Sequence, residues 1–153
     1  MPSLEHKIPP PLVGALVAAA MWGVCTFGPQ FSFAFTPRVV AVALLAAAGA
    51  GFDLLGLLAF RALRTTVNPL KPERASALVT GGIYRITRNP MYVGMALFLL
   101  AWAVYLAALL PFAGPIVFVV YITRFQIQPE ERVLMAIFGA QYSDYAARVR
   151  RWL

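Results

Sequence analysis

The sequence predicts an all-α polytopic membrane protein, a bundle of about four transmembrane helices followed by amphipathic helices. Three observations support this prediction: the composition, the apolar segments and the distribution of charge. Of the 153 residues, 61% are hydrophobic and only 12% are charged, whereas ordinary soluble domains carry about 25% charged residues. A soluble domain of this length cannot bury so much apolar surface. The length allows one compact bundle, so residues 1–153 are treated as a single domain.

Four apolar segments are expected to form the helices of the bundle: residues 12–27, 39–60, 91–110 and 115–125. A membrane-crossing helix needs about 20 apolar residues. The second and third segments meet this length, and the first is marginal. The fourth is short unless its helix continues toward Pro129. A Gly28–Pro29 break follows the first segment, and a tight turn formed by Pro111, Gly114 and Pro115 would make the last two segments an antiparallel hairpin.

Positive charge is concentrated in the connection between the second and third segments and in the last 30 residues. The basic residues of these two regions are Arg61, Arg64, Lys71, Arg74, Arg85, Arg88, Arg124, Arg132, Arg148, Arg150 and Arg151. The other two connections carry only Arg38. The positive-inside rule therefore places both basic regions in the cytoplasm, and four crossings would place both termini there as well. We expect a multi-pass protein of a bacterial inner membrane, whose +7 net charge contacts lipid headgroups rather than nucleic acid.

The sequence offers little for metal or thiol chemistry. A single cysteine, Cys25, permits no intramolecular disulfide, and its apolar surroundings are typical of a small buried side chain. The single histidine, His6, lies in a polar stretch before the first apolar segment. One His and one Cys do not make a His/Cys metal site. We therefore predict no metal.

The end of the chain predicts two short amphipathic helices. Pro129 suits the first turn of a helix, and Glu130 and Glu131 suit its positive end. Gly139 is expected to end this helix. Further residues then recur at spacings of three or four and would share one helix face: Tyr142, Tyr145, Val149 and Trp152.

Two polar stretches lie where the apolar segments end, residues 82–94 and a stretch that begins with Glu130 and Glu131. Asn89–Pro90 marks the start of the third helix, whose free N–H groups and dipole suit an anion. Gly94 allows a ligand or another helix to approach closely. The two glutamates would attract an amine or a sulfonium. A ligand with a carboxylate and a cationic centre fits this set, although each residue alone also fits an ordinary membrane interface.

Together the two stretches read Gly82-x-Tyr84-x-x-x-Arg88-Asn89-Pro90-x-Tyr92-x-Gly94 and Glu130-Glu131-x-x-Leu134-x-x-x-Phe138-Gly139-x-x-Tyr142-x-x-Tyr145. This pattern resembles the isoprenylcysteine carboxyl methyltransferase family, which is related to the phospholipid methyltransferases. Residues 65–69 also resemble small bacterial members. The resemblance implies an α-helical membrane enzyme that uses S-adenosylmethionine, with its cofactor-binding part over about residues 61–153.

Carried over residue by residue, the resemblance implies a cofactor site formed by Tyr84, Arg88, Asn89, Pro90, Tyr92, Gly94, Glu130, Glu131, Tyr142 and Tyr145. Arg124 and Glu131 would be catalytic, with Arg124 facing the acceptor. Which glutamate contacts the amino group or sulfonium of the cofactor stays open. Family members that methylate prenylated proteins usually have His where this chain has Asn89, and they have additional membrane helices. A prenylcysteine substrate therefore does not follow from the resemblance.

We predict an S-adenosylmethionine-dependent methyltransferase that acts at the cytoplasmic membrane face on a lipophilic or small membrane-partitioning acceptor. An isoprenylcysteine-like carboxylate, a thiol and an aminolipid all remain candidates, and the oligomeric state is open. Two alternatives are a small transporter component, suggested by Asp53 in the glycine-rich second segment, and a non-catalytic membrane scaffold. An acid inside a membrane helix is a functional candidate. We nevertheless favour a structural role for Asp53, through an arginine partner or close helix packing.

Overall fold

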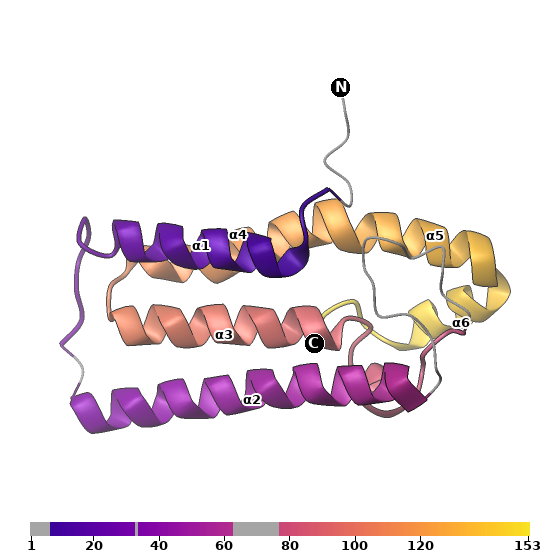
Figure 1. Cartoon of the computed structure of the whole chain (residues 1–153), viewed down its shortest axis with the longest axis horizontal. Helices are drawn as coiled ribbons and strands as arrows, with labels where there is room; N and C mark the ends of the chain where they lie inside the picture. Colours follow the sequence, from indigo (N-terminus) through magenta and orange to yellow (C-terminus); the bar gives the residue numbers. More distant parts are fainter. Residues whose placement is uncertain (1–6, 33, 63–76) are drawn as a thin grey trace.

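The computed structural model describes residues 7–32, 34–62 and 77–153, and the regular structure within these ranges is helical apart from one isolated bridge. The main helices are α1 (Pro10–Val24), α2 (Phe35–Ala62), α3 (Pro90–Leu106), α4 (Ala113–Ile122), α5 (Gln128–Phe138) and α6 (Ala140–Arg148). Figure 1 shows α1 to α4 running in alternating directions, with α3 between α2 and the layer formed by α1 and α4. This arrangement confirms the all-α prediction.

Among the described residues, two helical stretches are by length and composition apolar enough to cross a membrane: α2, and the continuous run Leu110–Phe138 that contains α4 and α5. α1 has 15 residues and α3 has 17. At 1.5 Å per residue they rise about 22 and 26 Å, less than the hydrocarbon thickness of about 30 Å. All four predicted apolar segments are therefore helical, while the number of membrane crossings stays a prediction.

The fourth apolar segment continues into α5 without a break, through a π-helical turn, η4 (Thr123–Ile127). In this turn the Gln128 N–H bonds to the Thr123 carbonyl, one residue farther back than in an α-helix. A proline cannot donate to the helix, and its ring presses on the carbonyl four residues before it. The wider turn directly before Pro129 relieves that pressure, so Pro129 lies in the first turn of α5 without starting a separate helix.

The turn between α3 and α4 lies earlier in the chain than the sequence predicted. After α3, Ala107 adopts a left-handed conformation with φ of 50°. A short helix, η3 (Leu110–Phe112), then leads into α4 at Ala113. Gly114 and Pro115 therefore belong to the first turn of α4, where the missing N–H of a proline costs no helical hydrogen bond.

α2 and α3 approach each other closely because glycines line their contact. A Cβ on Gly49 would lie 3.0 Å from the Gly94 carbonyl oxygen, and one on Gly56 would lie 3.0 Å from the Met91 side chain. A Cβ on Gly94 would collide with the Asp53 carboxylate. Small residues commonly permit such close approach between membrane helices. This contact fixes the start of α3 against the end of α2.

The starts of α1 and α3 and the ends of α2 and α4 meet at one end of the bundle, beside α5 and α6 (Figure 1). Gly139, with φ of 49°, ends α5 as predicted and lets the chain turn back into α6. Tyr142, Tyr145 and Val149 pack in one cluster, whereas Trp152 packs against a different one. The predicted common helix face therefore holds for Tyr142 and Tyr145. α6 ends at Arg148, so Val149 joins their cluster from the extended segment that follows, and Trp152 lies in the other cluster.

Candidate active site

An aromatic cluster forms where α2, α6 and the segment before α3 meet. A short 3₁₀ helix, η2 (Gly82–Arg85), begins at a glycine with φ of 59°, a conformation that suits glycine. It buries Tyr84 against Phe60 of α2, with ring centroids 5.5 Å apart in an edge-to-face arrangement. The Tyr145 hydroxyl of α6 donates a hydrogen bond to the Tyr84 carbonyl, at 2.8 Å. Burial raises the pKa of both tyrosines, so both hydroxyls are neutral at physiological pH.

The start of α3 directs a tyrosine toward α5. Pro90 is the first residue of α3, and Asn89 precedes it as the N-cap. One turn inside the helix, the buried Tyr92 hydroxyl donates to Glu130 Oε1 at 2.6 Å. This distance is short for a hydrogen bond between two oxygen atoms. It joins the two predicted polar stretches directly.

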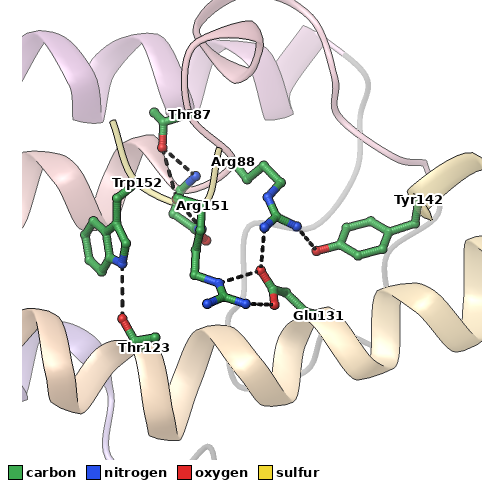
Figure 2. A network of polar contacts seen from close by, with 8 residues as sticks. Thr87, Arg88, Thr123, Glu131, Tyr142, Arg151 and Trp152 are labelled. Atoms are coloured by element: carbon green, nitrogen blue, oxygen red, sulfur yellow. Dashed lines mark hydrogen bonds and ion pairs between the residues drawn. The ribbon is translucent and has the colours of Figure 1, made fainter. Parts of the chain in front are cut away.

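Glu131 lies between two guanidinium groups (Figure 2). Arg151 Nε and Nη2 donate to its two carboxylate oxygens at 3.0 and 2.7 Å. Arg88 Nη2 lies 3.2 Å from Glu131 Oε1. The side chains of Arg88 and Glu131 are only 13% and 18% exposed, so solvent screens their ion pair weakly. Glu131 also holds the pKa of Arg151 above its usual value.

Arg88 also reaches α6, where its Nη1 donates to the Tyr142 hydroxyl at 3.2 Å. Burial raises the pKa of Tyr142 to about 12, with Glu131 adding to the shift and Arg88 opposing it. Arg88 Nε is buried and has no hydrogen-bond partner among the residues that the structure describes. A buried N–H of a cation without an acceptor is costly, so an additional anionic or polar partner for this atom would be favourable.

The last described residues complete the cluster. The carbonyl oxygens of Arg150 and Arg151 accept hydrogen bonds from residues 87–89, and the Trp152 indole N–H donates to Thr123 Oγ1 at 3.1 Å (Figure 2). These last residues were not among the predicted site residues, and the positive charge of the chain was expected to contact lipid headgroups. No local pattern could reveal a contact that depends on how the chain returns to α3.

The structure therefore brings together most of the predicted site residues: Tyr84, Arg88, Asn89, Pro90, Tyr92, Glu130, Glu131, Tyr142 and Tyr145. Gly94 lies against α2, where Asp53 and Gly49 fill the space beside it. Arg124 is exposed on η4, and its side chain contacts Gln128 and the Phe125 ring of its own helix. The predicted roles of these two residues in cofactor or acceptor binding stay predictions.

Asp53 has no hydrogen-bond partner for its buried Oδ1 atom among the residues that the structure describes. The basic connection that was expected to supply a partner falls largely within residues 63–76, outside the described residues. Residues 65–69, which resemble small bacterial family members, fall there as well. The described contact of Asp53 is with Gly94 of α3. The close helix packing expected around Asp53 is therefore present.

The apolar helices and the polar cluster at one end of the bundle define a helical membrane protein with a polar site. Comparison with known proteins identifies its family. The chain belongs to the phospholipid methyltransferase family, whose model matches residues 37–141. This range runs from α2 into α6 and contains most of the polar cluster. The predicted resemblance to membrane methyltransferases is confirmed, and the membership supports a methyltransferase activity.

Two relatives resemble parts of the chain. An uncharacterized protein of Haemophilus influenzae is 44% identical over 63 residues, which are 41% of this chain and all of that protein. Protein-S-isoprenylcysteine O-methyltransferase B of Arabidopsis thaliana is 39% identical over 85 residues. That match covers 52% of this chain but only 41% of the plant enzyme. No solved structure matches the chain.

Proposed function

We propose that this protein is an S-adenosylmethionine-dependent methyltransferase that binds its cofactor at the polar end of the bundle. The observation that supports this most directly is the difference between two adjacent glutamates. Glu131 is bound by two arginines, whereas Glu130 is bound by a neutral hydroxyl. A cofactor that carries both a carboxylate and cationic centres needs one positive and one negative subsite. The cluster offers both within neighbouring residues.

The positive subsite is centred on Arg88. Arg88 and Arg151 together carry one more charge than Glu131 neutralises, and Arg88 Nε has no partner within the described part of the chain. Guanidinium groups bind carboxylates through strong charge-assisted hydrogen bonds. We therefore assign the cofactor carboxylate to Arg88, with the neutral Tyr142 hydroxyl beside it. Glu131, which the sequence suggested as catalytic, would orient Arg88 in this arrangement.

The negative subsite is centred on Glu130. Its described partner is Tyr92, and no cation is paired with it in the part of the chain that the structure describes. Burial opposes a negative charge on this carboxyl group, and an amino group or a sulfonium beside it would stabilise the charged form. We therefore assign the cationic part of the cofactor to Glu130. Tyr84 and Tyr145 would supply aromatic surface beside it.

S-adenosylmethionine supplies an activated methyl group on its sulfonium. The protein then has to align donor and acceptor and exclude water, a contribution that proximity alone can make large. A carboxylate or thiolate acceptor needs no general base, whereas an amine or thiol first loses a proton. We propose that the acceptor is lipophilic, because the site adjoins apolar helices, and that the site faces the cytoplasm, because positive charge gathers at this end. Arg124 on η4 is a candidate contact for a polar head of the acceptor.

Titration of the purified full chain with S-adenosylmethionine tests the proposal. Saturable binding is expected, and both Glu130→Gln and Arg88→Ala are expected to weaken it about tenfold or more, since each removes a charge-assisted contact. Asp144→Asn, a change at an exposed acid of α6, is the matched control and should bind like the wild type. Absence of saturable binding by the wild type would leave the scaffold or transporter alternatives.

Labelled-methyl transfer identifies the acceptor. The full chain is incubated with labelled S-adenosylmethionine and a panel of prenylcysteines, thiols and aminolipids in vesicles. Label is expected in one class of compound, and product analysis shows whether oxygen, nitrogen or sulfur is methylated. Cofactor binding without transfer to any membrane-partitioning compound would contradict a lipophilic acceptor.

A further inference from the structure

We propose that residues 149–153 form a strap that fastens the segment before α3 to η4 and α5, and that Arg151 is a positioning residue acting through Glu131 on Arg88. The effect on S-adenosylmethionine rests on the proposed function. The fastening itself is a property of the fold and can be tested without cofactor. α6 ends at Arg148, and the strap that follows makes its contacts with other parts of the chain.

The strap backbone binds the segment before α3. The Arg88 N–H donates to the Arg150 carbonyl at 2.9 Å. The Arg151 carbonyl accepts twice, from Asn89 Nδ2 at 2.8 Å and from Thr87 Oγ1 at 3.2 Å. Thr87 is fully buried, and its hydroxyl also accepts from the Asn89 N–H at 3.2 Å. The Asn89 side chain therefore holds the strap by hydrogen-bonding to its backbone, which explains an amide side chain at this position.

The Arg151 side chain binds α5. Its two-pronged contact uses both oxygens of Glu131, so Arg88 shares Oε1 with Arg151 through a single nitrogen (Figure 2). Without Arg151, both oxygens of the Glu131 carboxylate could form a bidentate ion pair with Arg88. Bidentate pairing is the preferred geometry of guanidinium–carboxylate pairs. Arg151 therefore keeps Arg88 only partly engaged and leaves its Nε available.

Trp152 anchors the strap to the π-helical turn. Its indole N–H donates to Thr123 Oγ1 at 3.1 Å, and that hydroxyl donates to the Val119 carbonyl at 2.6 Å. The ring packs against a buried cluster that includes Tyr92 and Ile127. The five-residue strap thus reaches the segment before α3, η4 and α5. These are the elements that supply Arg88, Arg124, Glu130 and Glu131.

Amide hydrogen exchange on the unliganded full chain tests the fastening. Arg151→Ala is expected to speed exchange in the peptide covering residues 82–94, because the Arg88 N–H loses a stably held acceptor. Arg148→Ala removes the same charge just before the strap, where the side chain bonds within α6, and should leave that peptide unchanged. Equal exchange in the wild type and Arg151→Ala would overturn the strap.

A double-mutant cycle tests the positioning role. Arg151→Ala is expected to raise the dissociation constant for S-adenosylmethionine about tenfold. It should cause little further change in a Glu131→Gln background, because its effect passes through that carboxylate. Arg151→Lys should rescue binding in part, since an ammonium keeps the charge but not the fork. If Arg151→Ala and Glu131→Gln each raised the dissociation constant by the same factor in the double variant as alone, the positioning role would be overturned. A wild type that binds no cofactor would refute the proposed function and the positioning role, while the exchange result would still decide the strap.

Discussion

The α2–α3 contact and the polar end of the bundle both join segments that are far apart in the sequence, but they do so by opposite means. α2 and α3 meet where side chains are absent, at Gly49, Gly56 and Gly94. The polar end is joined by long side chains that exchange hydrogen bonds across η2, α3, α5, α6 and the strap. Stability in the first region should therefore depend on side-chain volume at the glycine positions. Stability in the second should depend on which side chains are available as hydrogen-bond and ion-pair partners.

Gly94→Ala should have the largest effect on stability. The added Cβ would collide with the Asp53 carboxylate and lie 2.8 Å from the Gly49 carbonyl oxygen, which is backbone and cannot move aside. Overpacking of this kind costs about 3 kcal/mol. Thermal unfolding in detergent, followed by the helical signal, measures the change. Gly51→Ala on α2 is the control, because its Cβ would meet nothing within 4 Å. An equal melting temperature for Gly94→Ala and wild type would contradict the expectation that added side-chain volume destabilises the α2–α3 contact.

Glu131→Ala should have the next largest effect. It leaves Arg88 and Arg151 close together with no carboxylate between them. Breaking a fully buried pair costs about 3–5 kcal/mol. These side chains are partly exposed, so we expect about 2 kcal/mol in the same unfolding measurement. Glu131→Gln should cost less because it keeps the hydrogen-bond acceptor. If both variants unfolded at the same temperature as the wild type, the ion-pair partners of Glu131 would not determine the stability of the polar end.

The helices could be predicted from the sequence because their signals are local. Apolar length gave the four segments, and Gly139 marked the end of α5 because a positive φ suits glycine. The position of the turn after α3 could not be predicted from Pro111, Gly114 and Pro115. Ala107 adopts the left-handed conformation there, and alanine has no intrinsic preference for it. Tertiary packing therefore decided where α3 ends.

The polar site was predictable in outline and not in its pairings. The motifs that resemble the methyltransferase family identified Tyr92 and Glu130, but no sequence rule showed that one hydrogen-bonds to the other. The roles of Glu130 and Glu131 were equally open, because adjacent helical residues point in different directions. Arg151 could not be distinguished from Arg148 or Arg150 until its contact with Glu131 was seen.

Tyr92→Phe should have a smaller effect, because it deletes one hydroxyl and keeps the buried ring. The lost hydrogen bond to Glu130 Oε1 is short, and a buried partner that is left unsatisfied costs about 1–3 kcal/mol. Glu130 retains partial access to solvent, so we expect about 1 kcal/mol. The unfolding measurement is repeated on Tyr105→Phe, whose half-exposed ring lies near the far end of α3. A larger loss for Tyr105→Phe would be inconsistent with the Glu130 contact.

Asp53→Ala should change stability least, within about 0.5 kcal/mol, although it removes an acid from an apolar helix. Its buried Oδ1 has no partner among the described residues, so the substitution removes an unpaired polar atom and also some packing, two effects of opposite sign. The variant should also restore part of the stability lost in Gly94→Ala, because one of the two groups that the new Cβ meets is then gone. The Gly49 carbonyl remains, so the rescue stays incomplete. Unfolding of the single and double variants measures this coupling. Strictly additive effects would mean that Asp53 does not fill the space beside Gly94, and a large loss from Asp53→Ala alone would contradict the expected balance of the two effects.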